Sequence, residues 1–358
     1  MYQALYRKWR PRTFDDVVGQ QHITETLKNQ IITGRLSHAY LFIGTRGTGK
    51  TTCAKILSRA VNCEHPVNGN PCNCCPSCLG IEDGSIMDVV ELDAASNNGV
   101  DNVRALREEA VFTPAVVKKR VYIVDEVHML SMQAFNALLK ILEEPPEHLM
   151  FILATTELQK VPATILSRCQ RHSFKRIDSG LIAEHLGTIA QREGLQLDPD
   201  AAQLLARLSE GGMRDAISLL DQCSGSEHIT TETVLSAMGL AGNSRTSALL
   251  EAAVAGDTGQ ALEIFSGLWR DGKDPSAFLG ELSTLLRDVL MAEVAPGSGA
   301  VLLSGGYDNA VLKRLSALLP RERLLCSLRE IESALAAMHA GQNPRTAAEL
   351  CIVALCEP

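Results

Sequence analysis

The chain has 358 residues, of which 46% are hydrophobic and 21% are charged, and its formal net charge is −8. This composition is typical of a globular protein with two or three packed domains, and it excludes a disordered or collagen-like chain and a strongly basic protein that coats DNA. No apolar run approaches the length of about 18 residues that a membrane-spanning helix needs. The first residues lack the apolar core of a signal peptide, so we expect a cytoplasmic protein with no membrane partner.

A glycine-rich loop follows a strand predicted at residues 39–43. The loop reads Gly-Thr-Arg-Gly-Thr-Gly-Lys-Thr and an amphipathic helix follows it, which together form the pattern of a P-loop. Backbone N–H groups of such a loop surround phosphate oxygens, so we expect ATP to bind here. Lys50 would reach the β- and γ-phosphates, and the Thr51 hydroxyl would bind Mg²⁺. The predicted nucleotide-binding residues are Gly44, Thr45, Arg46, Gly47, Thr48, Gly49, Lys50, Thr51 and Thr52.

Five of the eleven cysteines lie close together after this helix. Two overlapping C-x-x-C pairs lie within the cluster, and this spacing lets thiolates converge on one tetrahedral ion. Disulfides are rare in the cytosol, so we expect residues 63–78 to form an insertion that folds around a structural Zn²⁺. The predicted ligands are Cys63, Cys72, Cys75 and Cys78. Cys74 or His65 could replace one of them, and a loop of free cysteines is the alternative.

An acidic pair follows an apolar strand predicted at residues 120–124. Asp125 and Glu126 match a Walker B arrangement, in which one carboxylate holds the Mg²⁺ shell and the next polarises the attacking water. We assign Asp125 to the metal and Glu126 to the general base. An acidic pair at a strand end can also be a helix cap, but the P-loop in the same chain favours catalysis. His128 is interpreted as a packed or capping residue.

Further strands are predicted at residues 86–92 and 149–154, and the second of them ends in Thr155 and Thr156. A polar residue at such a strand end can contact the γ-phosphate or orient water. Strands that alternate with helices predict an α/β domain with a parallel sheet and helices on both faces. We expect this nucleotide-binding domain to cover residues 1–178.

Short motifs along this domain point to one family. They are Trp9-Arg-Pro11, Val17-Val-Gly-Gln20, Asp125-Glu-Val-His-Met-Leu130, Leu142-Glu-Glu-Pro-Pro146, Ser167-Arg-Cys169 and Gly212-Met-Arg-Asp215. The set closely resembles the gamma/tau subunits of bacterial DNA polymerase III, which are AAA+ ATPases of the sliding-clamp loader. The cysteine insertion directly after the P-loop helix is also similar to theirs and is not a general AAA+ feature.

The resemblance implies roles that the residues alone would not indicate. Arg168 looks like the arginine finger that reaches the ATP of a neighbouring subunit, and Arg214 looks like the second sensor, which contacts the γ-phosphate of the chain's own nucleotide. Thr155 or Thr156 matches the first sensor, and the sequence does not choose between them. Residues that resemble the adenine side of the nucleotide pocket are Arg7, Pro11 and Val18.

After residue 178 the sequence predicts helices almost throughout. The predicted helices cover residues 181–190, 199–208, 215–222, 230–238, 245–255, 258–271, 275–292 and 320–340, with a Gly-rich break at 296–306. Asn343 and Pro344 are an N-cap and a first-turn proline that open the last helix. The resemblance implies a helical lid over residues 179–241 and an all-α collar over 242–358 that holds a ring together.

The function that the resemblance implies is that of a clamp-loader motor within the DNA polymerase III holoenzyme. ATP binding and hydrolysis would open the sliding clamp and load it onto primed DNA, and the chain would have no polymerase active site of its own. The implied cofactors are ATP, Mg²⁺ and a structural Zn²⁺. The implied partners are the delta and delta-prime subunits, further copies of this chain, the sliding clamp and primer-template DNA, at the replisome on the nucleoid.

Other interpretations are possible. Another AAA+ DNA-processing motor, such as a Holliday-junction or initiator ATPase, is disfavoured by the Ser-Arg-Cys motif and the cysteine insertion. A non-hydrolysing scaffold subunit of the same ring is disfavoured by the complete P-loop and Walker B residues. In the family, the loop after Asp93-Ala-Ala-Ser96 helps to grip DNA, but here residues 97–101 contain no Lys or Arg. We therefore assign no DNA-contact residues.

Overall fold

The computed structural model describes residues 3–99, 105–106, 108–238, 243–295, 307 and 309–357. The chain divides into two compact units, of which the first consists of Met1–Leu195 with Leu205–Ser224 and the second of Gln196–Leu204 with Gly225–Pro358. The predicted Gly-rich break at 296–306, the boundary at 241–242 and part of the loop at 97–101 lie outside the described residues. Among the described residues, no helix has both the length and the apolar character of a membrane span.

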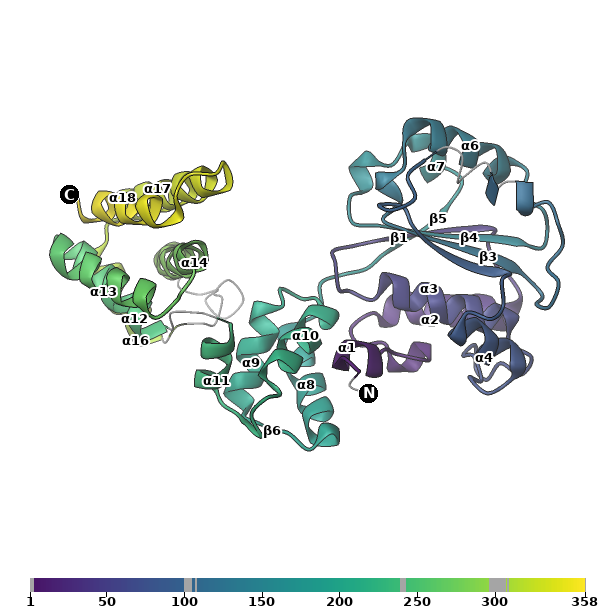
Figure 1. Cartoon of the computed structure of the whole chain (residues 1–358), viewed down its shortest axis with the longest axis horizontal. Helices are drawn as coiled ribbons and strands as arrows, with labels where there is room; N and C mark the ends of the chain where they lie inside the picture. Colours follow the sequence, from purple (N-terminus) through teal and green to yellow (C-terminus); the bar gives the residue numbers. More distant parts are fainter. Residues whose placement is uncertain are drawn as a thin grey trace. The chain divides into compact units, whose positions relative to one another are not determined.

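A five-stranded parallel sheet forms the centre of the first unit (Figure 1). Its strands lie in the order β2-β3-β4-β1-β5. In chain order they are β1 (Ala39–Ile43), β2 (Val89–Asp93), β3 (Arg120–Asp125), β4 (Leu149–Thr155) and β5 (Gln170–Ser173). The predicted α/β fold with a parallel sheet is confirmed. The carboxyl ends of β1, β3 and β4 are adjacent, which brings together the loops that carry the predicted site residues.

Helices cover both faces of this sheet (Figure 1). On one face, Leu27 of α2 (Gln21–Thr33) and Leu57 of α3 (Lys50–Asn62) are buried in the same cluster as Tyr40 and Phe42 of β1. On the other face, Phe135 of α6 (Met132–Glu143) is buried in a cluster with Tyr122 and Phe151. Alternate residues of β1, β3 and β4 therefore supply two cores.

Shorter elements connect the strands and long helices of this unit. Ahead of α2 come α1 (Leu5–Lys8) and η1 (Phe14–Asp16), and α4 (Pro76–Asp83) follows the cysteine segment. After β3 and β4 come η2 (Val127–Met129), η3 (Leu158–Lys160) and α7 (Ala163–Leu166). The unit ends with α8 (Ser179–Glu193) and α10 (Met213–Cys223), and α10 contacts both α8 and α1. The Leu5 N–H donates to Asp221 Oδ2 at 3.2 Å, which ties the start of the chain to α10.

In the residues that the structure describes, the second unit is helical apart from a two-stranded parallel pair. That pair is β6 (Gln196–Leu197) with β7 (His228–Ile229). Its helices are α11 (Thr231–Ala237), α12 (Asn243–Val254), α13 (Thr258–Arg270), α14 (Pro275–Val294), α16 (Asn309–Leu318), α17 (Arg321–His339) and α18 (Pro344–Cys356), while α9 (Pro199–Leu208) spans the boundary between the units. The predicted cap is confirmed, because the Asn343 side chain accepts hydrogen bonds from the N–H groups of Arg345 and Thr346.

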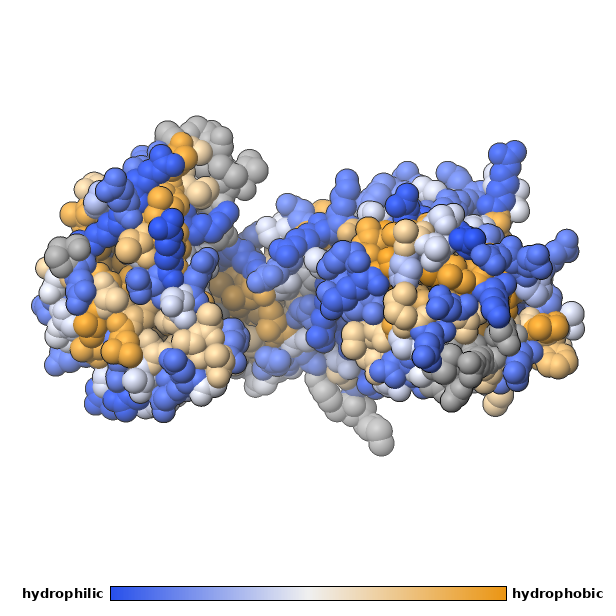
Figure 2. Space-filling model, turned by 90° about the horizontal axis from the view of Figure 1, so that it is seen from above, coloured by the Kyte–Doolittle hydropathy of each residue, from blue (hydrophilic) through white to orange (hydrophobic). Residues whose placement is uncertain are grey.

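The core of this unit comes from the apolar faces of its helices. Phe265, Phe278 and Leu282 are buried together with Ile331 and Ile352. Figure 2 shows apolar side chains in patches between hydrophilic ones on the visible face of the molecule. Exposed apolar side chains of the first unit include those of Met129 and Met132.

Candidate nucleotide and metal sites

The P-loop connects β1 to α3, and its backbone requires glycine. Gly47 has a φ of 77°, and a Cβ at this position would lie 2.9 Å from Asp215 Oδ2 and 2.9 Å from the Gly212 Cα. An L-residue here would be strained and would also collide with the start of α10. The P-loop can therefore lie this close to the start of α10 only with glycine at position 47.

Lys50 is the first residue of α3, and its side chain lies against the loop. Its Nζ donates to the carbonyl oxygens of Gly44 at 2.8 Å and Thr45 at 2.9 Å. Burial lowers the pKa of this ammonium, and the nearby carboxylates of Glu126 and Asp125 oppose that shift. A bound phosphate can replace the two carbonyls as the hydrogen-bond acceptor.

Thr51 and Asp125 already lie together. The Thr51 hydroxyl donates to Asp125 Oδ2 at 2.6 Å, which joins the start of α3 to the end of β3. A hydroxyl and a carboxylate are the protein oxygens that hold Mg²⁺ in P-loop proteins. These two residues fit such an ion because their oxygens converge at the mouth of the P-loop.

Glu126 follows β3 in a left-handed backbone conformation, with a φ of 47°. Its Oε2 accepts two hydrogen bonds from Thr156, one from the N–H at 3.0 Å and one from the hydroxyl at 2.9 Å. Thr155 is fully buried, and its hydroxyl lies 3.1 Å from His128 Nδ1. Of the two candidate sensor threonines, Thr156 is the one that contacts the carboxylate assigned as the base.

A cavity of about 680 Å³ opens in front of these groups. It is lined on one side by Asp125, Glu126 and the P-loop from Arg46 to Thr52, and on the other by Pro11 and Val18. Arg7, Gly44 and Thr45 do not line it. The lining also includes Trp9, Arg10 and Met213, which belong to the motifs of the sequence analysis, and Tyr6, His185 and Ile217, which the sequence did not single out. No local spacing marks Tyr6, His185 and Ile217, because they come from three separate elements, α1, α8 and α10.

Arg214 lies at the wall of this cavity, near the start of α10. Its backbone N–H donates to the Gly47 carbonyl at 3.4 Å, and its guanidinium lies 4.9 Å from the centre of the Tyr6 ring. Arg7 lies over the same ring at 5.7 Å. The hydrogen bond from Arg7 is the largest cause that lowers the pKa of the Tyr6 phenol. Tyr6 thus connects α1 to the cation that faces the nucleotide pocket.

Arg168 lies elsewhere, just after α7, and does not line the cavity. Its Nη2 is 2.7 Å from Glu143 Oε1, and its Nη1 donates to the Thr164 carbonyl at 2.8 Å. The structure therefore separates this arginine from the nucleotide site of its own chain.

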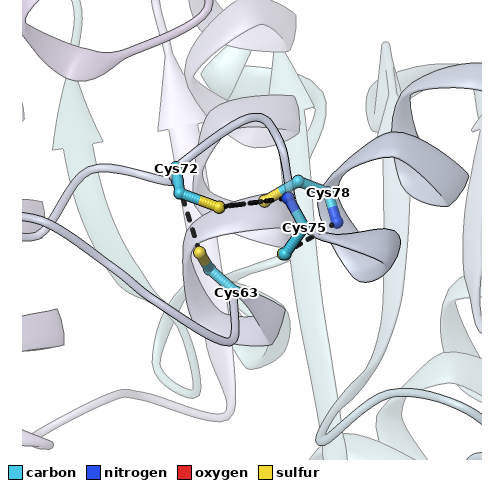
Figure 3. Close-up of side chains that lie close together, drawn as sticks. All are labelled: Cys63, Cys72, Cys75 and Cys78. Carbon is cyan, nitrogen blue, oxygen red and sulfur yellow. Dashed lines mark hydrogen bonds between the residues drawn. The ribbon is translucent and has the colours of Figure 1, made fainter.

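The four predicted cysteine ligands converge (Figure 3). Their sulfur atoms all lie within 4.8 Å of one another. Cys63 caps the end of α3, Cys75 is the N-cap of α4, and Cys78 lies within α4. Cys74 and His65 are exposed and do not belong to the group.

Backbone N–H groups point at these sulfurs. The Cys72 N–H donates to Cys63 Sγ at 3.3 Å, and the Cys75 N–H donates to Cys72 Sγ at 3.3 Å. A backbone hydrogen bond from Cys74 is the main cause that lowers the pKa of Cys72 to about 6. Four converging thiols with N–H groups directed at them are compatible with a tetrahedral zinc site.

A parallel sheet with a P-loop after β1, an acidic pair after β3 and a polar residue after β4 defines a P-loop nucleotide-binding protein of the AAA+ class. Three family models match successive stretches of the chain. They are described as the delta subunit of DNA polymerase III (residues 19–178), the ATPase lid domain of the DNA polymerase III clamp loader subunit (181–224) and domain III of DNA polymerase III subunits gamma and tau (229–358). The chain belongs to the family of DNA polymerase III gamma/tau subunits, as the sequence motifs indicated.

Curated relatives support this assignment. The chain is 46% identical over 99% of its length to the DNA polymerase III subunit tau of Bacillus subtilis, of which it covers 63%. It is 44% identical over 83% of its length to the tau subunit of Escherichia coli, of which it covers 46%. The chain thus spans about half to two thirds of these relatives. A RuvB mutant of Thermotoga maritima, 18% identical with a TM-score of 0.50 over 69% of this chain and 80% of its own, shares the fold.

Proposed function

We propose that this chain is the ATPase subunit of a bacterial clamp loader. It would use ATP binding and hydrolysis to open a sliding clamp and load it onto primed DNA within the DNA polymerase III holoenzyme. One observation carries the proposal: the cavity brings together Lys50, Thr51, Asp125, Glu126 and Arg214, while Arg168 lies outside it. The site therefore has the groups for hydrolysis except for an arginine finger, which Arg168 of another subunit would supply.

The chain's own groups define the reaction. P-loop N–H groups and Lys50 bind the phosphates, and Thr51 with Asp125 would hold the ion, which supplies positive charge to the phosphate oxygens when bound. Glu126 accepts a proton from the attacking water at Oε2, the oxygen that Thr156 holds in this structure. Arg214 neutralises charge on the γ-phosphate from within the chain. Arg168 would do so from the neighbouring chain, after it leaves Glu143.

The remaining assignments belong to the same proposal. Residues 1–178 would be the AAA+ domain, 179–241 the lid and 242–358 the collar. The cysteine group would bind one Zn²⁺. This ion would be structural, because four thiolates leave no open coordination position for catalysis. The partners would be the delta and delta-prime subunits, further copies of this chain, the clamp and primer-template DNA, in the cytoplasm at the replisome. Relatives named as DNA polymerase III subunits support these partners.

ATPase assays of the reconstituted clamp loader test the proposal. The rate is measured without additions, with primed DNA alone, and with clamp plus primed DNA. We expect the wild type to be stimulated most by clamp and DNA together. Lys50→Ala should lose hydrolysis and nucleotide binding. Arg168→Ala should keep nucleotide binding and lose the stimulated rate by about 10³-fold.

Arg171→Ala is the matched control, because Arg171 is an exposed arginine three residues further along. Stimulation by DNA alone, with no effect of the clamp, would favour another DNA-processing motor. Full stimulated activity in Arg168→Ala would contradict the role of Arg168 as a finger. A wild type without ATPase activity would contradict the proposal as a whole.

A further inference from the structure

His128 lies between the two strand ends that carry the catalytic residues. It belongs to η2, directly after β3, and its side chain is 6% exposed. Its Nδ1 lies 3.1 Å from Thr155 Oγ1 at the end of β4, and its Nε2 lies 3.2 Å from Glu157 Oε1. One ring nitrogen therefore contacts the end of β4, and the other contacts the segment that follows it.

The Thr155 hydroxyl and the Glu157 carboxylate are the polar partners of the imidazole. Nδ1 of His128 shares a hydrogen bond with the Thr155 hydroxyl, and Nε2 pairs with the Glu157 carboxylate. The Thr155 oxygen also accepts from the Glu157 N–H at 3.1 Å. The three residues thus form a closed ring of polar contacts.

This ring, formed by His128, Thr155 and Glu157, contains the two chain neighbours of Thr156. Residues 155 and 157 are both fixed by it, and Thr156 between them donates two hydrogen bonds to Glu126. His128 Nδ1 is also 3.4 Å from Glu126 Oε2. Among these contacts, the hydrogen bonds to that carboxylate oxygen come from Thr156.

The same ring holds the beginning of the segment that leads to Arg168. Glu157 precedes η3, which is followed by α7 and then by Arg168. Outside the ring, Lys160 of η3 pairs with Glu157 Oε2 at 2.9 Å. The buried imidazole of His128 therefore lies next to Glu126, the base of its own nucleotide site. It also contacts the start of the segment that ends in Arg168, which would act in the site of the neighbouring subunit.

We propose that His128 is a positioning residue for hydrolysis. It holds Thr156 in place against Glu126, and it links the catalytic base of one site to the segment that carries Arg168. This inference rests on the proposed ATPase function and adds a residue to it. His128 does not line the nucleotide cavity, and it contacts Thr155 and Glu157 on either side of Thr156, so it acts on the base by holding Thr156.

Three substitutions separate the two polar contacts of His128, to Thr155 and to Glu157. Asn places an oxygen near the position of Nδ1 and keeps the acceptor for Thr155, whereas Gln places an N–H near the position of Nε2 and keeps the donor to Glu157. Ala keeps neither. His148→Ala is the matched control, because His148 is a half-buried histidine whose Nε2 lies 3.1 Å from the Ala110 carbonyl, away from the cavity.

The full chain in the reconstituted clamp loader is assayed for kcat and KM, and its affinity for a fluorescent ADP is measured separately. His128→Ala should lower kcat about tenfold, with KM and ADP affinity unchanged, because the base loses its orientation and the phosphate site does not. His128→Asn and His128→Gln should each recover part of kcat. The control should match the wild type.

Two outcomes would overturn the inference. One is a kcat in His128→Ala that equals that of the wild type. If the wild-type protein is active in the same assay, this result refutes the role of His128 and leaves the proposed ATPase function in place. The other is a parallel loss of kcat, ADP affinity and melting temperature in all three variants, which would make the role of His128 structural only. Combining His128→Ala with Arg168→Ala tests the link: we expect a smaller effect of His128→Ala in that background, and additive effects would refute the link.

Discussion

Arg168 forms an ion pair with Glu143 of its own chain, with 2.7 Å between Arg168 Nη2 and Glu143 Oε1. Glu143 is the last residue of α6, and Arg168 follows α7, so two short elements fix the guanidinium on the surface. A finger that reaches another subunit must break this pair and the hydrogen bond to the Thr164 carbonyl. Breaking this ion pair costs a small free energy, so the pair opposes the movement of Arg168 to the nucleotide of another subunit.

Removing the carboxylate should make Arg168 easier to engage. Glu143→Ala is expected to raise the stimulated ATPase rate of the assembled ring by up to about fivefold, since an exposed ion pair contributes at most about 1 kcal/mol. The measurement is steady-state hydrolysis with clamp and primed DNA, with Glu144→Ala as the control at the neighbouring exposed position. A slower rate in Glu143→Ala would mean that Glu143 supports the engaged finger instead.

The two threonines after β4 should give different phenotypes. Thr156→Val removes the hydroxyl that contacts Glu126, so we expect kcat to fall by about 10- to 100-fold with little change in stability. Thr155→Val removes a fully buried hydroxyl from His128 and from the Glu157 N–H, and should cost about 1–3 kcal/mol of unfolding free energy in addition to activity. Urea unfolding and ATPase assays of both variants check this. Equal stability in the two variants would contradict the assignment.

The local motifs could be predicted from the sequence because neighbouring residues form them. The P-loop, the acidic pair and the cysteine group each depend on spacing within a short segment, and the structure brings the expected cysteines together. The strand predicted at 86–92 instead covers Val89–Asp93, because a turn precedes it, in which the Val89 N–H donates to the Ile86 carbonyl at 3.5 Å.

Other features depend on contacts between distant segments and have no local pattern. The strand β5, Gln170–Ser173, is polar in sequence and only His172 is buried, so alternation of apolar residues does not mark it. Tyr6 faces Arg214 only because α1 packs against α10. The contacts of His128 likewise require the ends of β3 and β4 to be adjacent, and the sequence indicated only packing or capping for this residue.

The cysteine group should show a defined pH dependence in the metal-free chain. The pKa of Cys72 is lowered to about 6, so its thiolate forms as the pH rises through about 6. A hydrogen bond to Cys72, followed by the Cys72 charge, raises the pKa of the exposed Cys74 above its usual value. After removal of metal with a chelator, iodoacetamide should therefore alkylate Cys72 at a lower pH than Cys74, as read by mass spectrometry.

Zinc should reverse this order of reactivity. A bound ion protects Cys72 and leaves Cys74 open to alkylation, and zinc analysis should find about one ion per chain. Cys75→Ser should lose that ion, whereas Cys74→Ser should keep it. Equal zinc content in Cys75→Ser and the wild type would contradict the proposed ligand set. Loss of zinc in Cys74→Ser would mean that Cys74 is a ligand in place of one of the four cysteines.

Tyr6 should support nucleotide binding through its ring. The ring faces Arg214 at 4.9 Å, and such a cation–π contact contributes about 0.5–1 kcal/mol at an exposed site, or about two- to fivefold in affinity. Tyr6→Leu should weaken binding of a non-hydrolysable ATP analogue by that factor, because Arg214 loses the surface that orients it. Tyr6→Phe keeps the ring and loses only the hydroxyl that accepts from Arg7 Nε at 3.2 Å, so its affinity should stay near that of the wild type. Equal losses in both variants would assign the effect to the hydroxyl and Arg7 rather than to Arg214.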